Sequence, residues 1–321
     1  MLYLTEDDVR GLLTMSDALA AVEAAFRKLS LDEAENRPRQ RVQTDQVMLH
    51  VLPAAVKTLG AIGFKAYTTG KFGARFHVTL FDPKTGELAA LLEADHLGRV
   101  RTGAASGVAT RKLARPDAAT VGLFGTGGQA RTQLEAVCAV RAINRVHVYG
   151  RDAAKRTAFA AEMADVCNTD VVPVESPEAA AHDLDIVCTA TSSREPILKG
   201  EWLADGCHVN LVGSNYLAKA EADAEVFRRA TLVTTDSKDQ AKLEAGDFVA
   251  PIRDGVIGWG DVLEFSHVLA GRYPGRQSPA DVTVFKSLGL GVEDVAVAAK
   301  VLELARARGV GRLLDLGERR A

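Results

Sequence analysis

The chain has 321 residues, a hydrophobic fraction of 47%, and a formal net charge of −3 from 39 Lys and Arg against 42 Asp and Glu. That length suits about two domains, each with its own core. The charge balance argues against a basic nucleic-acid surface and against an acidic disordered tail. The acidic start MLYLTEDDVRGLL lacks a secretory leader's basic segment, and no apolar run is long enough for a membrane span. We therefore expect a cytoplasmic protein with no nucleic-acid or membrane partner.

The four cysteines are spread along the chain without CxxC pairs or metal-ligand spacing. They are Cys138, Cys167, Cys188 and Cys207. We expect each to behave as a small buried hydrophobic residue, and we predict no metal site.

The first part of the chain, up to about Pro116, begins with a predicted capped helix. Thr5 stands before three acidic residues that suit the start of the helix dipole, and apolar residues then recur at helical spacing through Phe26. Short β-like runs follow at Val47–Leu52 and Ala61–Tyr67. Strands joined by turns indicate an antiparallel sheet.

The segment HVTLFDPKTGELAALLEA is typical of a hairpin, with its turn residues at Asp82-Pro83-Lys84-Thr85-Gly86. It leads into RTGAASGVATRKLA, where small residues at helical spacing would let a helix approach a neighbour very closely.

From about Asp117 the pattern changes to strand, glycine-rich turn, helix and strand. TVGLF, RVHVYGR, DIVCTATS, HVNLVGSN, TLVTTD and DVTVFKSLG are the predicted β runs. This alternation predicts an α/β fold with a mostly parallel, doubly wound Rossmann sheet. A last amphipathic helix over Val292–Arg308 could return to the first domain. We place the Rossmann domain at 117–302, and an α+β domain for substrate binding and dimerisation at 1–116 and 303–321.

Gly125-Thr126-Gly127-Gly128-Gln129-Ala130 matches GxGxxA between the strand Thr120–Phe124 and a predicted helix over Ala130–Val140. Glycines allow a tight turn and close approach to a pyrophosphate, and the free N–H groups at the helix start face its charge. The motif in this setting predicts binding of NAD(P)(H).

The end of the second strand decides which dinucleotide is preferred. An acidic residue there favours NAD, and an arginine accommodates the 2′-phosphate of NADP. Gly150 is followed by Arg151 and then Asp152. Arg151 gives a slight lean to NADP(H), although Asp152 could serve NAD and Arg151 could be a solvated loop residue.

The chain resembles the ornithine cyclodeaminase/mu-crystallin family over nearly its whole length. The resemblance is carried by LFDPKTGELAALLEADHLGRVRTGAASGVATRKLA, VGLFGTGGQA, DIVCTATSSREPIL, VNLVGSN and VFKSLG, in that order. It implies a homodimer whose N-terminal segment and final helix form the substrate domain. It also implies hydride transfer beside the carboxylate of an amino, imino or keto acid.

Three basic residues are similar to the family's carboxylate clamp, namely Arg41 in RVQTDQ, Lys65 in GFKAY and Arg101 in RTGAAS. A guanidinium fixes a small carboxylate with two parallel bonds. Lys65 lies in an apolar run, where burial would depress its pKa and suit it to donate a proton. The alternatives are a snorkelling edge-strand lysine for Lys65, a surface salt bridge for Arg101, and a solvated position for Arg41 within RPRQR.

The chain departs from the ornithine cyclodeaminases at two positions. By resemblance, His50 and Asn215 stand where those enzymes hold the distal ammonium of ornithine with acidic residues. Because a buried ammonium without an anion is costly, ornithine cyclodeamination is doubtful. Arg75 and His77 would share one strand face in the region of the substrate pocket, where they could bind a second carboxylate. Alternatively, Arg75 is solvated and His77 fills a core position.

Further cofactor contacts are implied by the resemblance alone, and the acidic run EADAEVF is interpreted differently. We expect Glu221 to Glu225 to be helix-start charges. These implied cofactor residues are Thr102, Thr189, Ala190, Thr191, Gly213, Ser214, Ser287 and Gly289.

Together these features predict an NAD(P)H-dependent enzyme that reduces a small α-imino acid to an L-amino acid. Iminosuccinate, iminopropionate (pyruvate plus ammonia) and cyclic ketimines are the candidate substrates. Two alternatives stay open, an NAD-dependent ornithine cyclodeaminase without net redox change and a mu-crystallin-like protein that only binds nucleotide or a small ligand.

Overall fold

The computed structural model describes residues 1–315 and divides into two compact units. The first unit comprises Met1–Arg101 and the described chain from Leu290 onward, and the second comprises Thr102–Gly289. These bounds differ from the expected 1–116 and 303–321. The reason is local packing: residues after Arg101 pack against the Rossmann helices, whereas the whole final helix packs on the first sheet.

A largely antiparallel sheet forms the framework of the first unit. Its strand order is β16-β1-β7-β6-β5-β4-β2, with β3 also paired to β4 and only β1 and β7 parallel among neighbours. The strands are β1 (Leu2–Leu4), β2 (Ala34–Asn36), β3 (Gln40–Gln43), β4 (Val47–Val56), β5 (Ala61–Gly70), β6 (Gly73–Phe81), β7 (Leu88–Glu93) and β16 (Arg312–Leu313). The predicted antiparallel sheet is confirmed.

The hairpin β6–β7 is confirmed, and its turn chemistry explains the sharp reversal. Asp82 Oδ1 accepts hydrogen bonds from the amides of Lys84 (2.8 Å) and Thr85 (3.0 Å). Gly86 has φ +72°, a left-handed conformation that costs glycine little.

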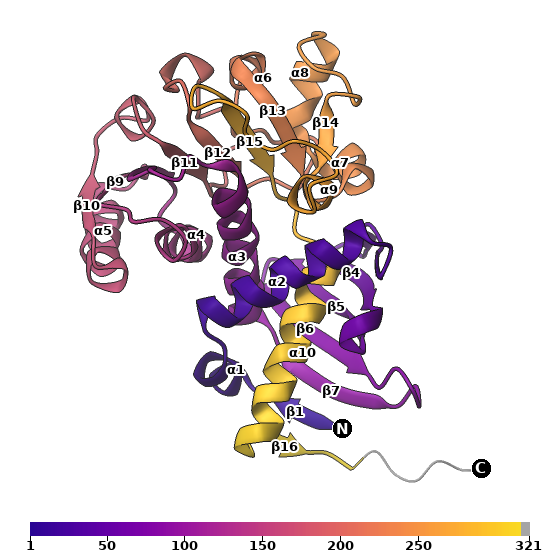
Figure 1. Cartoon of the computed structure of the whole chain (residues 1–321). Coiled ribbons are helices and arrows are strands. Elements are labelled where there is room, and N and C mark those ends of the chain that lie inside the picture. Colours follow the sequence, from indigo (N-terminus) through magenta and orange to yellow (C-terminus); the bar gives the residue numbers. More distant parts are fainter. Residues whose placement is uncertain (316–321) are drawn as a thin grey trace. The chain divides into compact units, whose positions relative to one another are not determined.

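The N-terminal helical pattern is two helices rather than one. α1 (Glu6–Leu12) begins with the predicted Thr5 cap, but the backbone extends at Leu13 and Thr14 caps a second helix, α2 (Met15–Ser30). The capping side chain of Thr14 competes with helix continuation, which explains the break. α10 (Gly291–Arg308) packs against α2 and over β4, β5 and β6 (Figure 1).

The second unit is the predicted doubly wound Rossmann fold, with a sheet whose paired strands are all parallel. The strand order is β10-β9-β8-β11-β12-β15-β13-β14 (Figure 1). The strands are β8 (Thr120–Phe124), β9 (Arg145–Tyr149), β10 (Asp170–Pro173), β11 (Ile186–Thr189), β12 (His208–Leu211), β13 (Ala230–Thr235), β14 (Val262–Glu264) and β15 (Val282–Lys286).

Helices and apolar clusters cover both faces of this sheet. One cluster contains Val121 with Phe159, and the other contains Phe124 with Phe227 and Phe248. The helices are α4 (Gly128–Cys138), α5 (Ala153–Cys167), α6 (Ala224–Arg229), α7 (Lys238–Glu244), α8 (Val249–Arg253) and α9 (Phe265–Leu269). Cys188 and Cys207 are buried as expected, whereas Cys138 and Cys167 are half-buried.

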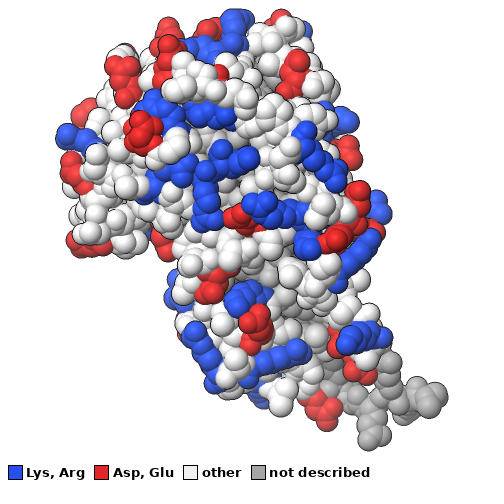
Figure 2. Space-filling model, in the orientation of Figure 1, with Lys and Arg blue, Asp and Glu red and all other residues white. Residues whose placement is uncertain are grey.

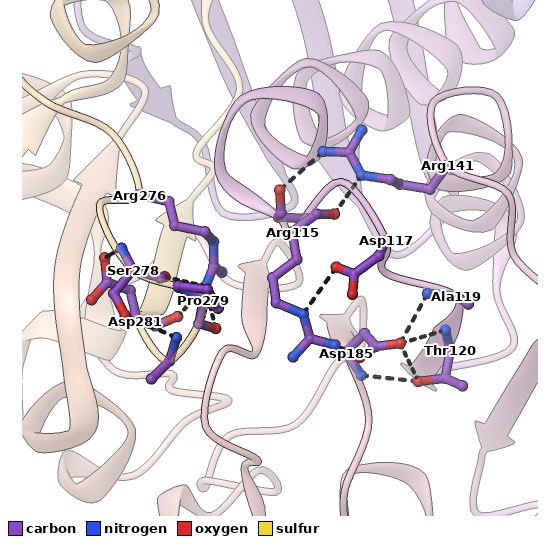
Figure 3. A network of polar contacts seen from close by, with 12 residues as sticks. Arg115, Asp117, Ala119, Thr120, Arg141, Asp185, Arg276, Ser278, Pro279 and Asp281 are labelled. Carbon is purple, nitrogen blue, oxygen red and sulfur yellow. Dashed lines mark hydrogen bonds and ion pairs between the residues drawn. The ribbon is translucent and has the colours of Figure 1, made fainter.

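The long helix α3 (Asp95–Leu113) passes from the first unit into the second, where its small residues allow very close packing. A Cβ on Gly103 would lie only 2.3 Å from the carbonyl oxygen of Thr132 on α4, which confirms the expected close approach. Arg141 caps the C-terminus of α3, donating to the carbonyl of Thr110 at 3.0 Å. It also donates to the carbonyl of Arg115 at 2.9 Å (Figure 3). A cation at this end also suits the helix dipole.

Charged side chains of both signs are interspersed over the face shown in Figure 2, without a large field of one sign. Within residues 1–315, no helix is both long and apolar enough to cross a membrane.

Candidate functional site

The glycine turn after β8 forms a cradle with open space above it. Gly125 has φ +111°, and a Cβ there would lie 2.4 Å from the carbonyl oxygen of Ala190. Gly127 is the N-cap of α4, and a Cβ added to it would meet no atom within 4 Å. The helix therefore begins at Gly128, earlier than the expected Ala130, and its first N–H groups are available to an anion.

A cavity of about 770 Å³ opens over this turn. Its lining comprises Gly125, Thr126, Gly127, Gly128, Gln129, Tyr149, Gly150, Arg151, Ala190, Thr191, Ser192, Ser193, Arg194 and Ile197. The turn fits a dinucleotide pyrophosphate, because it combines a glycine at the open position with the positive end of a helix.

A second hollow, of about 550 Å³, is lined by Thr126, Arg151, Asp152 and Lys155. The carboxylate of Asp152 is engaged as the N-cap of α5, since its Oδ1 accepts the amide of Lys155 at 3.0 Å. Arg151 and Lys155 are exposed. This hollow therefore offers two cations and an acidic residue that already caps a helix.

The remaining candidate cofactor residues differ in their surroundings. Thr189 is fully buried and donates to Glu221, so its side chain faces the protein interior rather than the cavity. The buried hydroxyl of Ser214 donates to the carbonyl of Lys219 (2.8 Å). Other groups are held by side chains. Glu221 accepts the amide of Gly213, Asp236 accepts the hydroxyl of Ser287 and the amide of Gly289, and the side-chain amide of Gln133 donates to the carbonyl of Thr102.

In the first unit, two of the three predicted clamp residues lie in one buried cluster. Lys65 Nζ lies 3.1 Å from Asp294 Oδ1, and Arg101 donates to the same oxygen through Nε at 2.8 Å. Arg101 Nη1 also donates to Glu293 Oε2 at 2.6 Å. Lys65 is 4% exposed and Arg101 5% exposed, so neither the snorkelling lysine nor the surface salt bridge describes them.

The electrostatics of this cluster give the two cations different roles. Burial lowers the pKa of Lys65 to about 8; Asp294 opposes that shift and Arg101 adds to it. Burial also opposes the charge of Arg101, yet Asp294 and Glu293 raise its pKa above the usual value. Arg101 is thus a permanent cation, and Lys65 can exchange a proton near neutral pH.

Arg41, the third predicted clamp residue, contacts His50. The two residues are paired across β3 and β4, with Arg41 Nε 3.3 Å from His50 Nδ1. His50 Nε2 lies 3.0 Å from Thr69 Oγ1. Burial, followed by the charges of Arg41 and Arg39, lowers the pKa of His50 to about 4, so this imidazole is neutral in a cationic field.

Arg39 is a functional candidate that our reading of the sequence missed. It is 6% exposed, and its charge helps to lower the pKa of both Lys65 and His50. The signal was present in RPRQR, where Arg39 and Arg41 stand two residues apart. Glu293 and Asp294 were also missed, because acidic residues in the first turn of a helix are ordinarily explained by the helix dipole.

Aromatic rings form the rest of the surface beside Lys65. His50 stacks on Tyr67 with ring centroids 4.1 Å apart, and Tyr67 stacks on Phe76 at 4.9 Å. Lys65 Nζ lies 5.6 Å from the centroids of both the Tyr67 and the Phe76 ring. Because Tyr67 is stacked between His50 and Phe76, an apolar group beside a carboxylate bound here would meet the edges of these rings.

Arg75 and His77 do share one strand face, but it is the wrong face for the pocket. In the β5–β6 register Lys65 pairs with Val78 and Tyr67 with Phe76, whereas His77 pairs with Ala66 and Arg75 with Thr68. Successive residues alternate between faces, so Arg75 and His77 point away from the face that carries Lys65. This register contradicts our expectation that Arg75 and His77 bind a second substrate carboxylate beside Lys65.

Asn215 follows the buried Ser214 in the second unit and is half-buried. The helix-start interpretation of the acidic run is confirmed for Asp223, which caps α6, and for Glu225 in its first turn. It is wrong for Glu221, which is fully buried before the helix begins.

Residues 1–309 match the model of the ornithine cyclodeaminase/mu-crystallin family. The chain is 35% identical over 325 residues to Delta(1)-pyrroline-2-carboxylate reductase of Bacillus cereus, covering 98% of this chain and 100% of that protein. Among solved structures, Delta(1)-pyrroline-2-carboxylate reductase of Thermococcus litoralis in complex with NADH and L-proline has a TM-score of 0.93 at 35% identity. The match covers 98% of this chain and 100% of that chain. An archaeal alanine dehydrogenase dimer with bound NAD has a TM-score of 0.92 at 32% identity, covering 99% of each chain.

Proposed function

The chain belongs to the ornithine cyclodeaminase/mu-crystallin family and is an NAD(P)-dependent oxidoreductase of imino and amino acids, and on that premise we propose that it reduces a cyclic ketimine carboxylate to an L-amino acid. Delta(1)-pyrroline-2-carboxylate is the proposed substrate. The observation that carries this proposal is the buried Lys65–Arg101 pair beside the rings of Tyr67 and Phe76.

The substrate carboxylate binds to the guanidinium of Arg101 with the ammonium of Lys65 beside it. Both cations are held by Asp294 and are shielded from water, which strengthens their attraction for an anion. Arg39 adds positive charge near Lys65. This fixed arrangement orients the C=N bond of the substrate.

Lys65, or a water that it orders, protonates the imine nitrogen and so makes the adjacent carbon more electrophilic. A pKa of about 8 keeps much of Lys65 protonated at neutral pH while allowing it to give up its proton. The bound dinucleotide supplies the hydride. The balance is imine plus NAD(P)H plus one proton giving amine plus NAD(P)+.

The row of stacked rings favours a hydrocarbon ring over a charged side chain. A five- or six-membered ring would pack against the edges of Tyr67 and Phe76. The distal ammonium of ornithine would face His50, which is neutral and flanked by two arginine charges. His50 therefore does not supply the anion that ornithine cyclodeamination requires.

For the cofactor, we propose a modest preference for NADP(H). Arg151 and Lys155 line the hollow beside the glycine turn and can receive a 2′-phosphate, whereas Asp152 is engaged as a helix cap. The solved relatives named above hold NADH or NAD.

We also propose a homodimer formed through the first unit. The sheet face that points away from Lys65 carries apolar side chains, including Ile62, which is 42% exposed, and the half-buried Val51, Phe64 and Phe81. A second copy would cover these side chains and Arg75 with His77.

The test is a spectrophotometric screen of NADH and NADPH oxidation. Substrates are pyrroline- and piperideine-2-carboxylate, and pyruvate, glyoxylate and oxaloacetate with ammonia. We expect the highest kcat/KM with a cyclic ketimine. Faster turnover of oxaloacetate with ammonia would favour iminosuccinate instead. Release of ammonia and proline from L-ornithine, without net change in nicotinamide absorbance, would indicate a cyclodeaminase.

A further inference from the structure

Glu221 is a buried carboxylate that joins two loops at the carboxyl edge of the Rossmann sheet. It is fully buried and accepts four hydrogen bonds. Oε1 accepts the amide and the hydroxyl of Thr191, both at 2.7 Å. Oε2 accepts the hydroxyl of Thr189 at 2.7 Å and the amide of Gly213 at 2.6 Å. These donors follow the neighbouring strands β11 and β12.

The first of these loops forms a wall of the dinucleotide cavity. Ala190 and Thr191 line that cavity, and the carbonyl oxygen of Ala190 lies where a Cβ on Gly125 would be. The amide of Ala190 donates to the carbonyl of Phe124 at 2.8 Å, directly before the glycine turn. A shift of the Thr189–Thr191 segment would therefore move the support of the phosphate cradle.

Two further buried charges hold Glu221 in place. Asp247 Oδ1 accepts the amide of Glu221 at 2.6 Å, and Asp247 Oδ2 lies 2.8 Å from Lys286 Nζ. Lys286 also donates to the carbonyl of Ser214 at 2.7 Å. Burial and the charge of Asp247 raise the pKa of Glu221, and Lys286 is the cation that opposes them.

This position requires a side chain with an acceptor oxygen on both sides. Each oxygen of Glu221 faces one backbone amide, from Thr191 or Gly213, and a backbone amide can only donate. A glutamine amide in either orientation would direct its NH2 group at one of these two donors. The close fit also requires Gly213, since a Cβ there would lie 2.4 Å from Glu221 Oε1.

We propose that Glu221 is a positioning residue for dinucleotide binding, which sets the shape of the cavity by fixing the loops after β11 and β12 without touching the cofactor. The proposal requires dinucleotide binding in the cavity over Gly125–Gly128, and it is independent of which imine is reduced.

Asp185 provides a matched control at the amino end of β11, whereas the donors to Glu221 lie at the carboxyl ends of β11 and β12. Its Oδ2 accepts the amides of Ala119 (2.9 Å) and Thr120 (3.0 Å) and the Thr120 hydroxyl (2.9 Å), and its Oδ1 contacts Arg115 (Figure 3). Asp185→Asn thus removes the charge of a similarly bonded carboxylate at the end of the strands that lies away from the glycine turn.

The experiment measures NADH affinity by fluorescence titration and stability by urea unfolding for the wild type, Glu221→Gln and Asp185→Asn. We expect Glu221→Gln to weaken NADH binding by about tenfold or more, because one charge-assisted bond becomes a repulsive contact. Its KM for NADH should rise while its KM for the imine stays near the wild-type value. Asp185→Asn should lower the unfolding midpoint and leave NADH affinity unchanged.

Unchanged NADH affinity in a folded Glu221→Gln protein would overturn the proposal, as would an equal loss of affinity in Asp185→Asn. If Glu221→Gln does not fold, Thr189→Val decides the question, because it removes one buried donor to Glu221 and keeps the shape of the side chain. Thr189→Val should weaken NADH binding by a few-fold, and wild-type affinity would contradict the inference. Absence of NADH binding by the wild type would instead refute the dinucleotide site itself.

Discussion

Asp294 holds Lys65 in the buried cluster of the first unit, with Oδ1 3.1 Å from Nζ and the carboxylate side chain fully buried. The same oxygen accepts Arg101 Nε at 2.8 Å. One carboxylate therefore fixes the distance between Lys65, the proposed proton donor, and Arg101, the proposed carboxylate anchor. Its charge also opposes the lowering of the Lys65 pKa by burial.

Replacement of Asp294 by Asn should move the alkaline limb of the pH profile to lower pH. Lys65 must be protonated to act as donor, so kcat/KM of the wild type should fall as the pH rises through about 8. Loss of the Asp294 charge lowers the pKa of Lys65 further. Glu293→Gln is the control, because Glu293 contacts Arg101 and should reduce kcat/KM with less movement of the limb. If the alkaline limb lies at the same pH in both variants, Lys65 is not the proton donor.

Arg39→Gln should impair the enzyme more than Arg41→Gln. Arg39 is buried and its charge acts on Lys65, whereas Arg41 contacts His50. We expect Arg39→Gln to raise the KM for the imine about tenfold, the effect of one charge-assisted contact. Removing its positive charge should also raise the pKa of Lys65 and shift the alkaline limb upward. The reverse ranking of the two variants in steady-state kinetics would restore Arg41 as the main clamp residue.

Arg151→Ala should weaken NADPH binding and spare NADH binding. The guanidinium lines the hollow that we assign to the 2′-phosphate, and NADH lacks that group. We expect about a tenfold loss of NADPH affinity in fluorescence titrations, as one phosphate contact is removed. Thr14→Ala serves as the control, since loss of the α2 cap should lower stability without changing the ratio of the two affinities. Equal losses for NADPH and NADH in Arg151→Ala would refute the preference.

Acid should destabilise the folded protein through His208. Burial lowers the pKa of His208 from 6.5 to about 3, so the folded protein keeps it neutral while the unfolded chain takes up a proton near pH 6.5. Above pH 6.5 the free energy of unfolding does not depend on the protonation of His208. Below that pH it falls with decreasing pH until about pH 3. We expect a loss of about 1 kcal/mol from His208 between pH 7 and pH 5.5 in urea unfolding.

The variant His208→Asn should flatten this dependence. An unchanged slope in His208→Asn would show that other groups cause the acid sensitivity.

Local patterns were sufficient for much of this fold. Thr5, the turn at Asp82–Gly86 and the glycine motif each specify backbone geometry through their nearest neighbours, and the small residues of α3 indicated its close packing. The break between α1 and α2 was missed because helical periodicity continues across Leu13 while Thr14 stops the helix.

The candidate site was harder to predict because it depends on contacts distant in sequence. Lys65 and Arg101 were found through the family resemblance, but their partner Asp294 lies on the last helix. Arg75 and His77 were correctly placed on one face, yet only the register with β5 decides which face carries Lys65. The sequence around Glu221 predicts an exposed charge at the start of a helix, and only the folded loops show that this side chain is buried.

Hydride transfer to the imine carbon of a cyclic ketimine carboxylate can be followed with an isotope. The enzyme is incubated with Delta(1)-pyrroline-2-carboxylate and nicotinamide nucleotide deuterated at the transferring position, and the product is analysed by mass spectrometry. We expect L-proline with one deuterium on the carbon beside the carboxylate, and no labelled product with Arg101→Ala despite retained NADH binding. Unlabelled proline, or no proline from a protein that binds NADH, would contradict the proposed reduction.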